Sequence, residues 1–425
     1  MSEQPQPDLV LTLADACVQC GLCLPHCPTY ALTGDESESP RGRIAIARAL
    51  ADGRLAAEPS ADAALDHCLG CRRCEVVCPA HVAFAPLLLE TRRRQRRRRG
   101  ASLRQHALEW LTAHPALLSR LLHLARSLSQ QRSLWQVAVG WVERSETHQP
   151  RHCNSPDGFR CALPILRRPS EAARTTGVRS CLLPRASDPF NFGVARGKRQ
   201  DLTPSLEPIA IFSGCIARAY DAELSSALDQ LLIATGFAPQ RPTRQTCCGT
   251  LHLHAGNVAQ AAALATTNAH AFAGCGTVVC TASGCHAALA DALAPAQRLR
   301  DALAVLAERA DRLHFRAASG PVALHLPCSQ QTVVGSEAAL RQLFARIPDL
   351  TVIELHGMGC CGAAGTHMLD HPARAAALRA PLLQAASVGG ASIMVSANIG
   401  CRLHLAAGSD IEVVHPIVFL ARHLS

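Results

Sequence analysis

Two cysteine runs near the amino terminus have a spacing that suits metal clusters. CVQCGLCLPHCP occupies residues 17–28, and CLGCRRCEVVCP occupies residues 68–79. In both runs, four cysteines are separated by two, two and three residues, and a proline follows the last cysteine. Iron-sulfur clusters need four thiolates around a compact inorganic core, and runs of this spacing supply them to pairs of [4Fe-4S] clusters. The repeated spacing therefore predicts two such clusters.

In a paired arrangement, three cysteines of one run hold a cluster and the fourth cysteine crosses to the other cluster. We assign the first cluster to Cys17, Cys20, Cys23 and Cys78, and the second cluster to Cys68, Cys71, Cys74 and Cys27. Pro28 and Pro79 would turn the chain away after each crossing ligand, and Gly21 and Gly70 would keep the loops close to the clusters. Zinc is the alternative, although zinc sites of four cysteines usually contain two separated C-x2-C pairs.

Cysteines also mark the second half of the chain, where they follow predicted strands. Short apolar segments end in cysteine-bearing turns in PIAIFSGC, TVVCTASGC, VALHLPC, TVIELHGMGCC and SIMVSANIGC, all after residue 206. Helical segments such as ELSSALDQLLIAT and SEAALRQLFARI follow several of these strands. Alternating strands and helices predict parallel α/β layers, in which ligands gather beyond the carboxyl ends of the strands.

This cysteine-rich region is an internal repeat. Cys215, Cys247, Cys248 and His254 recur at Cys328, Cys360, Cys361 and His367, each displaced by 113 positions, and Cys285 recurs at Cys401, displaced by 116. We expect the four cysteines of each repeat to converge on a metal or redox centre. The alternative is that they are inert, buried thiols at strand ends. His254 and His367 are candidate contacts of such a centre, although a lone histidine is more often a hydrogen-bonding structural residue.

Composition narrows the classes of function. The chain has 425 residues, 21 cysteines and a formal charge of +9. It has no recognisable signal segment and no apolar run long enough to span a membrane, so we expect a cytoplasmic protein whose cysteines bind metal. The arginine cluster RRRQRRRR at residues 92–99 favours a solvated face or linker, with docking on an acidic partner or an anionic membrane surface as the alternative. No aromatic platform accompanies this charge, so we expect no nucleic-acid binding.

These patterns predict a multidomain protein, in which an α-helical domain with two [4Fe-4S] clusters precedes two duplicated α/β domains. We place the cluster domain at residues 1–95, a helical linker and poorly ordered insertion at 96–205, and the two repeats at 206–318 and 319–425. In the cluster domain, Ser39 should cap a helix that begins at Pro40 and stops near Gly53. In the linker, residues 101–140 predict an amphipathic helical hairpin with a break at Pro115.

Two clusters transfer electrons but provide no substrate pocket. A catalyst that oxidises a substrate is therefore required, and the chain lacks the motifs that would bind its cofactor. No G-x-G-x-x-G sequence follows a predicted strand, and no Walker loop is present. We therefore expect the primary catalyst on another chain.

The order of the motifs resembles the iron-sulfur subunits of glycolate oxidase, a glycolate dehydrogenase. Two ferredoxin runs flank GDESESPRGRI, and two CCG domains follow with TASGC, CCGAAGT and SANIGC, so that the resemblance covers residues 10–100 and 206–425. Similar CCG domains occur in a subunit of anaerobic glycerol-3-phosphate dehydrogenase, in lactate-utilisation proteins and in heterodisulfide reductases. The CCG domain by itself therefore indicates a superfamily, and CCGAAGT and SANIGC favour the glycolate branch.

The resemblance implies that a flavoprotein partner carrying FAD oxidises glycolate to glyoxylate, while this chain passes the electrons towards a quinone. It also implies peripheral contact with the inner face of the cytoplasmic membrane and a further iron-sulfur centre in the CCG domains. The C-x2-C pair that closes the heterodisulfide reductase motif is incomplete here, because no second cysteine stands three positions from Cys285 or Cys401. Those positions hold Ala282 and Ala288 around Cys285, and Asn398 and His404 around Cys401. The alternatives are the equivalent subunit of an anaerobic glycerol-3-phosphate or lactate dehydrogenase, and a zinc-stabilised interaction scaffold.

Overall fold

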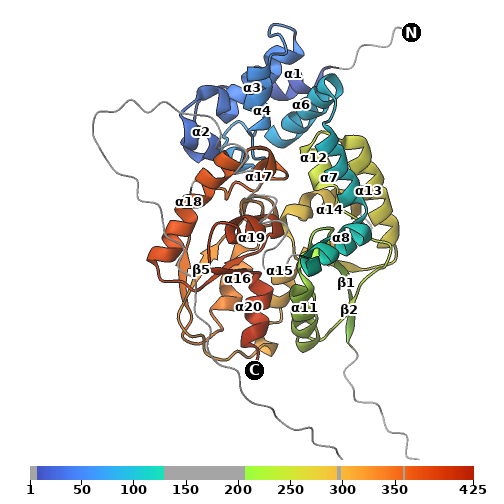
Figure 1. The fold of residues 1–425 in the computed structure, drawn as a ribbon, viewed down its shortest axis with the longest axis vertical. Helices are drawn as coiled ribbons and strands as arrows, with labels where there is room; N and C mark the ends of the chain where they lie inside the picture. Colours follow the sequence, from blue (N-terminus) through green and yellow to red (C-terminus); the bar gives the residue numbers. More distant parts are fainter. Residues whose placement is uncertain (1–6, 129–205, 294–297, 358) are drawn as a thin grey trace, which may run out of the picture. The chain divides into compact units, whose positions relative to one another are not determined.

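The computed structural model describes residues 7–128, 206–293, 298–357 and 359–425 (Figure 1). The predicted insertion at 141–205, with Cys153, Cys161 and Cys181, lies outside the described residues. The last part of the predicted hairpin, 129–140, also lies outside them.

Six short helices build the N-terminal region. They are α1 (Leu9–Asp15), α2 (Pro28–Thr33), α3 (Pro40–Ala51), α4 (Pro59–Asp66), α5 (Arg73–Val76) and α6 (Phe84–Arg99). Proline occupies the first position of α2, α3 and α4, where its missing N–H is not needed and its fixed φ suits a helix. The predicted cap of α3 is confirmed, since Ser39 Oγ accepts a hydrogen bond from the Gly42 N–H at 3.0 Å.

A small apolar core holds these helices together. α1 packs against α3 and α6 through buried residues such as Val10, Ile44 and Leu87. Cys17, Cys68, Cys74 and Cys78 pack against the edge of this core. The two cysteine loops are therefore supported by one set of helices.

The two predicted helices of the linker, and the break between them at Pro115, are confirmed within the described residues. α7 (Leu103–Ala113) and α8 (Pro115–Leu128) are separated at His114, directly before Pro115. Glu109 fixes α7 to its surroundings, because its carboxylate accepts two hydrogen bonds from Arg96 at 2.6 and 2.9 Å and one from Asn257 Nδ2 at 2.7 Å. α7 thus bonds both to α6 and to the first repeat.

Two parallel sheets of four strands follow. The first contains β1 (Glu207–Phe212), β2 (Phe237–Gln240), β3 (Thr277–Cys280) and β4 (Arg298–Asp301), and the second contains β5 (Pro321–His325), β6 (Thr351–Glu354), β7 (Ile393–Ser396) and β8 (Glu412–Val414). The strand order is β2-β1-β3-β4 in one and β6-β5-β7-β8 in the other, which is the same order element by element. The five predicted strands are β1, β3, β5, β6 and β7, and the shared topology supports the predicted duplication.

Helices connect the strands of each repeat. The first repeat has α10 (Ala217–Tyr220), α11 (Ala222–Ala234), α12 (Thr250–His254), α13 (Val258–Ala271), α14 (His286–Leu293) and α15 (Ala302–Ala307). The second has the π-helical turn η5 (Gln330–Val334), followed by α16 (Glu337–Phe344), α17 (His367–Asp370), α18 (Pro372–Val388), α19 (Ile399–Ala406) and α20 (Pro416–His423).

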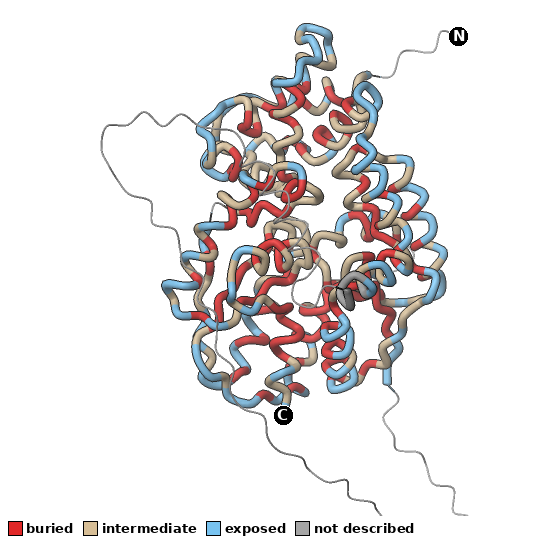
Figure 2. The backbone as a smooth tube through the Cα atoms, in the orientation of Figure 1, coloured by how far each residue is buried: buried red, intermediate tan, exposed pale blue. Residues whose placement is uncertain are grey.

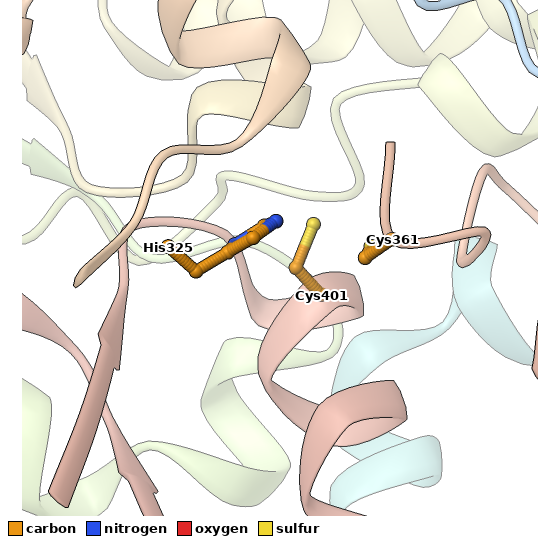
Figure 3. A group of neighbouring side chains, drawn as sticks. All are labelled: His325, Cys361 and Cys401. Atoms are coloured by element: carbon orange, nitrogen blue, oxygen red, sulfur yellow. The ribbon is translucent and has the colours of Figure 1, made fainter. Parts of the chain in front are cut away.

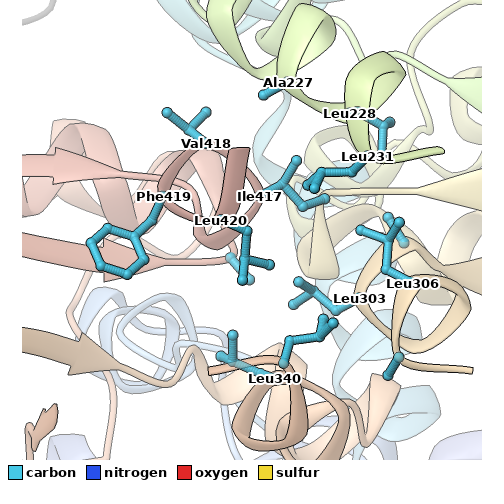
Figure 4. Packing of buried hydrophobic residues seen from close by; sticks show 14 of the residues in the cluster. Ala227, Leu228, Leu231, Leu303, Leu306, Leu340, Ile417, Val418, Phe419 and Leu420 are labelled. Atoms are coloured by element: carbon cyan, nitrogen blue, oxygen red, sulfur yellow. The ribbon is translucent and has the colours of Figure 1, made fainter. Parts of the chain in front are cut away.

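The two repeats share one hydrophobic core. Leu231 of α11 lies beside Ile417 of α20, as Figure 4 shows, and Leu228, Leu303 and Leu420 belong to the same buried cluster. Figure 2 shows the buried residues concentrated along the strands and on the inner sides of these helices. A buried ion pair between Arg402 and Asp221, with N–O distances of 2.9 and 2.5 Å, adds a polar contact between the repeats.

The arginine cluster is partly bonded within the protein and partly exposed, since Arg97, Arg98 and Arg99 at the end of α6 are exposed. It occupies the end of α6, where Arg93 contacts Glu90, Arg94 contacts Asp8 at 2.8 Å, and Arg99 contacts Asp66 at 2.8 Å. Arg92 turns inward and donates to the Cys68 carbonyl at 2.6 Å. These contacts explain how so many like charges are tolerated on one helix.

Candidate metal centres

The N-terminal cysteines line two cavities. One cavity is lined by Cys17, Cys20, Cys23, Cys74 and Cys78. The other is lined by Cys27, Cys68, Cys71 and Cys74. Each predicted set of four ligands thus lines one cavity, and both crossing cysteines, Cys27 and Cys78, lie with the opposite run. The thiols and their pairing fit two cubane clusters, although the ligand assignment itself stays a prediction.

The two cysteine loops have the same backbone conformation. Gln19 and Gly70 occupy equivalent positions, 51 residues apart, and both have φ near +60°. Gly21 and Arg72 form a second equivalent pair, also with positive φ. Non-glycine residues rarely adopt this region, so the strain at Gln19 and Arg72 indicates that the loop shape is imposed by what the cysteines must surround.

Arg43 is buried beside the second cavity. Its guanidinium donates to the Ala64 carbonyl at 2.6 Å, to Thr29 Oγ1 at 2.9 Å and to the Cys27 thiol at 3.8 Å. A positive charge at this position offsets the negative charge that a set of thiolates would carry. Burial, together with the nearby Cys328, raises the pKa of the Cys71 thiol, so this thiol stays protonated unless a cation binds beside it.

The four cysteines of each repeat lie close to one another, and their role as ligands of a centre stays a prediction. In the first repeat, Cys215 Sγ lies 3.5 Å from Cys247 Sγ, and Cys248 contacts Cys247 and Cys285. In the second repeat, side-chain contacts run from Cys328 to Cys360, from Cys360 to Cys361 and from Cys361 to Cys401. All of these thiols are buried except Cys285 and Cys328, which are partly exposed.

The predicted histidines lie near the centres in different ways. His254 packs between the second cysteine loop and the second repeat, since a Cβ placed on Gly70 would lie 3.1 Å from its ring and one on Gly365 would lie 3.2 Å from it. Burial lowers the pKa of His254 to about 4. His367 Nδ1 donates to the Gly362 carbonyl at 3.0 Å, which suits the structural alternative.

A histidine that the sequence analysis did not select lies among the thiols of the second repeat. One potential ligand atom each of His325, Cys361 and Cys401 lie within 4.8 Å of one another, and all three residues are buried. Figure 3 shows the His325 ring directed towards Cys401, with Cys361 beyond it. The available signal was a polar residue at the end of the buried strand in VALHLPC, three positions before Cys328.

The second cysteine loop contacts the second repeat directly. Thr332 Oγ1 in η5 lies 3.0 Å from the Cys71 carbonyl oxygen and 2.9 Å from the Cys328 carbonyl oxygen. Arg73 donates to Gln331 Oε1 at 3.3 Å and packs over Gly359. Glu38 also accepts a hydrogen bond from Arg374. Through Thr332, Cys71 of the N-terminal cluster domain is thus linked to Cys328 of the second repeat.

Comparisons with known proteins agree with this arrangement. Residues 13–82 match the 4Fe-4S dicluster domain, and residues 209–290 and 322–406 match the cysteine-rich CCG domain. The probable glycolate oxidase iron-sulfur subunit of Bacillus subtilis is 30% identical over 420 residues, which cover 93% of this chain and 89% of that protein. The chain belongs to the family of glycolate oxidase iron-sulfur subunits. The glycolate oxidase iron-sulfur subunit of Escherichia coli is 29% identical over 432 residues, covering 96% of this chain and 94% of that protein.

Membership of the glycolate oxidase iron-sulfur subunit family confirms the predicted fold class and an electron-transfer role for iron-sulfur clusters. A subunit of the fumarate reductase (CoM/CoB) of Methanothermobacter marburgensis is 27% identical over 161 residues, or 37% of this chain and 33% of that protein. Across the described parts of the chain, none of the helices combines the length and the apolar character that crossing a bilayer requires.

Proposed function

We propose that this chain is the electron-transfer subunit of a complex that oxidises glycolate to glyoxylate. The observation that carries the proposal is the pair of cysteine-lined cavities, one with Cys17, Cys20, Cys23 and Cys78 and the other with Cys27, Cys68, Cys71 and Cys74. We assign one [4Fe-4S] cluster to each set. The family of the chain supports glycolate as the substrate of the complex.

The reaction explains why an electron-transfer chain is needed. Oxidation of a 2-hydroxy acid to a 2-oxo acid releases two electrons and two protons, and FAD on a partner subunit would accept them. A [4Fe-4S] cluster exchanges one electron at a time. The cysteines of this chain would hold two such groups, and Arg43 and Phe84 line the second cavity beside them.

The first cysteine loop is the proposed entry for electrons. Cys20 is exposed, and the neighbouring Val18 and Leu22 expose 70% and 56% of their surface. Exposed apolar side chains beside a redox centre suit a protein partner, because docking would cover them and bring the flavin within electron-transfer reach. The flavoprotein is therefore proposed to bind at this loop.

The second cysteine loop is the proposed exit. Thr332 contacts the Cys71 carbonyl, and Cys71 lies near Cys360 of the second repeat. An electron on the second cluster would therefore have the cysteines of the second repeat as its neighbours. We assign the repeat cysteines Cys215, Cys247, Cys248 and Cys285, with Cys328, Cys360, Cys361 and Cys401, to further centres. The final acceptor is proposed to be a quinone, which a cytoplasmic protein would reach by peripheral contact with the inner face of the membrane.

Substrate-dependent bleaching tests the proposal. The full chain would be co-expressed with its flavoprotein partner, purified without oxygen and mixed with glycolate, glycerol 3-phosphate or lactate. We expect glycolate to bleach the visible iron-sulfur absorption and glycerol 3-phosphate to leave it unchanged. If glycerol 3-phosphate or lactate bleached the absorption and glycolate did not, glycolate would be ruled out as the substrate. A colourless chain that contains zinc would support the scaffold alternative.

A pair of variants tests the entry loop in the same assay. Leu22→Asp should abolish bleaching by glycolate while dithionite still reduces the chain, because the charge disrupts docking without removing a thiol. Leu103→Asp is the matched control, since Leu103 is also exposed but lies on α7. Equal bleaching in both variants would contradict docking at the first loop.

A further inference from the structure

The two repeats differ at one position of their central strands. His325 ends β5 and Phe212 ends β1, and they are related by the same displacement of 113 positions as Cys215 and Cys328. Their register partners, Ser396 on β7 and Cys280 on β3, are displaced by 116 positions. A hydrogen-bonding histidine and serine in the second repeat thus replace an apolar pair in the first.

The ring of His325 is held in one orientation. Its Nδ1 lies 2.9 Å from Ser396 Oγ, and the side chain is 4% exposed. This hydrogen bond suits a neutral imidazole with the proton on Nδ1, which leaves the lone pair of Nε2 available. Metal-binding histidines are commonly fixed in this way, with one nitrogen bonded to the protein and the other facing the metal.

The thiols around His325 complete a set of donors. Cys361 and Cys401 each place a potential ligand atom within 4.8 Å of the one offered by His325. Cys328 and Cys360 continue the same line of contacting thiols. One imidazole and up to four thiols therefore meet at the carboxyl end of the second sheet.

Two other buried histidines of the second repeat, His404 and His415, are bonded at both ring nitrogens. His404 Nε2 lies 3.0 Å from the Ala375 carbonyl oxygen, and its Nδ1 contacts Arg379. His415 Nε2 lies 3.0 Å from the Thr281 carbonyl oxygen, and its Nδ1 accepts from the Ile417 N–H. His367 has one bonded nitrogen, Nδ1, and its Nε2 is buried without a hydrogen-bond partner. Among the described residues, His325 differs because a nitrogen of its ring lies within 4.8 Å of the thiols of Cys361 and Cys401.

We propose that His325 is an imidazole ligand of a metal centre in the second repeat, together with the thiolates of Cys361 and Cys401. Mixed sulfur and nitrogen donors select a thiophilic first-row metal, namely iron in an iron-sulfur centre or zinc. The first repeat, with Phe212 at the equivalent position, lacks this imidazole. The inference rests on the proposed function and deepens it, because it names an additional ligand of the centre assigned to the cysteines of the second repeat.

The surroundings give this centre an accessible side. A cavity of about 390 Å³ is lined by His325 and Cys360, and also by Arg73, Arg341 and His356. Cys361 and Cys401 do not line this cavity, so it borders the proposed centre only on the side of His325 and Cys360. In iron-sulfur centres, replacing thiolate by imidazole raises the reduction potential, so an iron centre here would be a better electron acceptor than an all-thiolate one.

Spectroscopy on the full chain tests the ligand. The protein would be purified without oxygen, its iron and zinc counted, and its paramagnetic states examined by pulsed paramagnetic resonance after growth with ¹⁵N-histidine. For an iron centre we expect a histidine nitrogen coupling that disappears in His325→Phe, while the signals of the N-terminal clusters remain. For zinc, we expect His325→Phe to lose one equivalent of zinc and its zinc-edge absorption to lose the nitrogen contribution.

Two further variants keep the test decisive if His325→Phe folds poorly. His325→Cys should retain the metal but lose the nitrogen coupling, and Phe212→Leu should leave both unchanged. Metal in the second repeat without a histidine nitrogen coupling would overturn the proposal. Unchanged metal content and spectra in His325→Phe, or no metal beyond the N-terminal clusters, would overturn it as well.

Discussion

Thr332 in the second repeat bonds to the backbone of Cys71 in the second cysteine loop, with 3.0 Å between Oγ1 and the carbonyl oxygen. The same hydroxyl lies 2.9 Å from the Cys328 carbonyl oxygen. Cys71 and Cys328, which are 257 positions apart in the sequence, therefore both contact the side chain of Thr332. This contact holds the second cysteine loop close to the cysteines of the second repeat.

Replacing Thr332 by valine should weaken this contact. The isosteric change removes the hydroxyl, so we expect a loss of about 1 kcal/mol in the free energy of unfolding. Thr267→Val is the matched control, because Thr267 on the exposed face of α13 bonds only to the Ala263 carbonyl of its own helix. Denaturant unfolding measures both variants, and an equal loss in the two would show that the bond to Cys71 contributes nothing.

Replacing Arg43 by methionine should damage the second cluster site. The change leaves the Ala64 carbonyl and other buried groups without their donor, which we expect to cost about 3 kcal/mol. Arg48→Met is the control on the same helix, since its ion pair with Asp15 is half exposed and should contribute about 1 kcal/mol or less. Thermal unfolding and iron content report the difference, and full iron content with wild-type stability in Arg43→Met would refute this role.

The core shared by the repeats predicts that two alanine substitutions on α11 differ in how much they lower the free energy of unfolding. Leu231→Ala empties a fully buried position between α11 and α20, so we expect a loss of about 2–5 kcal/mol. Ile233→Ala, two residues later, removes a side chain that is 51% exposed and should cost about 1 kcal/mol or less. Comparable losses from both substitutions would argue against a joint core.

His415 predicts an acid-sensitive contact between the repeats. Burial, with the nearby positive charge of Arg402, lowers its pKa from 6.5 to about 3. Between these pH values the unfolded chain binds a proton that the folded chain does not, so the folded state loses stability as pH falls, by at most about 1.4 kcal/mol per pH unit. The loss should begin below about pH 6.5 and end near pH 3.

The variant His415→Asn separates this group from the other buried histidines. An asparagine oxygen can still accept from the Ile417 N–H and cap α20, but it does not bind the proton. We expect the slope of stability against pH to decrease by up to one proton relative to the wild type. An unchanged slope would show that His415 does not cause the acid sensitivity.

Elements that depend on local patterns could be predicted from the sequence. They are the helix cap at Ser39, the break at Pro115 and the central strands of the two sheets, and all of these match the structure. The displacement of 113 positions likewise anticipated two sheets of identical strand order. β2, β4 and β8 were not predicted. No cysteine-bearing turn follows β4 or β8, and β2, whose sequence is FAPQ, lacks the apolar pattern of a strand although Cys247 and Cys248 come after it.

Contacts between distant segments could not be predicted in the same way. The roles of Thr332 and Arg43 depend on which loop folds against which, and neither residue belongs to a spaced motif. The arginines of α6 were expected to be a solvated face or linker, whereas their acidic partners come from several separate segments. His325 could have been noticed as a polar residue in a buried strand, but its neighbours Cys361 and Cys401 are set by the fold.

The central claim, that the eight N-terminal cysteines hold two [4Fe-4S] clusters, is tested most directly by iron and sulfide analysis with paramagnetic resonance. The full chain, purified without oxygen and reduced with dithionite, should contain at least about eight iron atoms and show two interacting clusters. Cys27→Ser should alter one of the two signals, whereas Cys275→Ser, outside both cavities, should alter neither. A chain that stays colourless and silent after reconstitution with ferrous iron and sulfide would contradict the account.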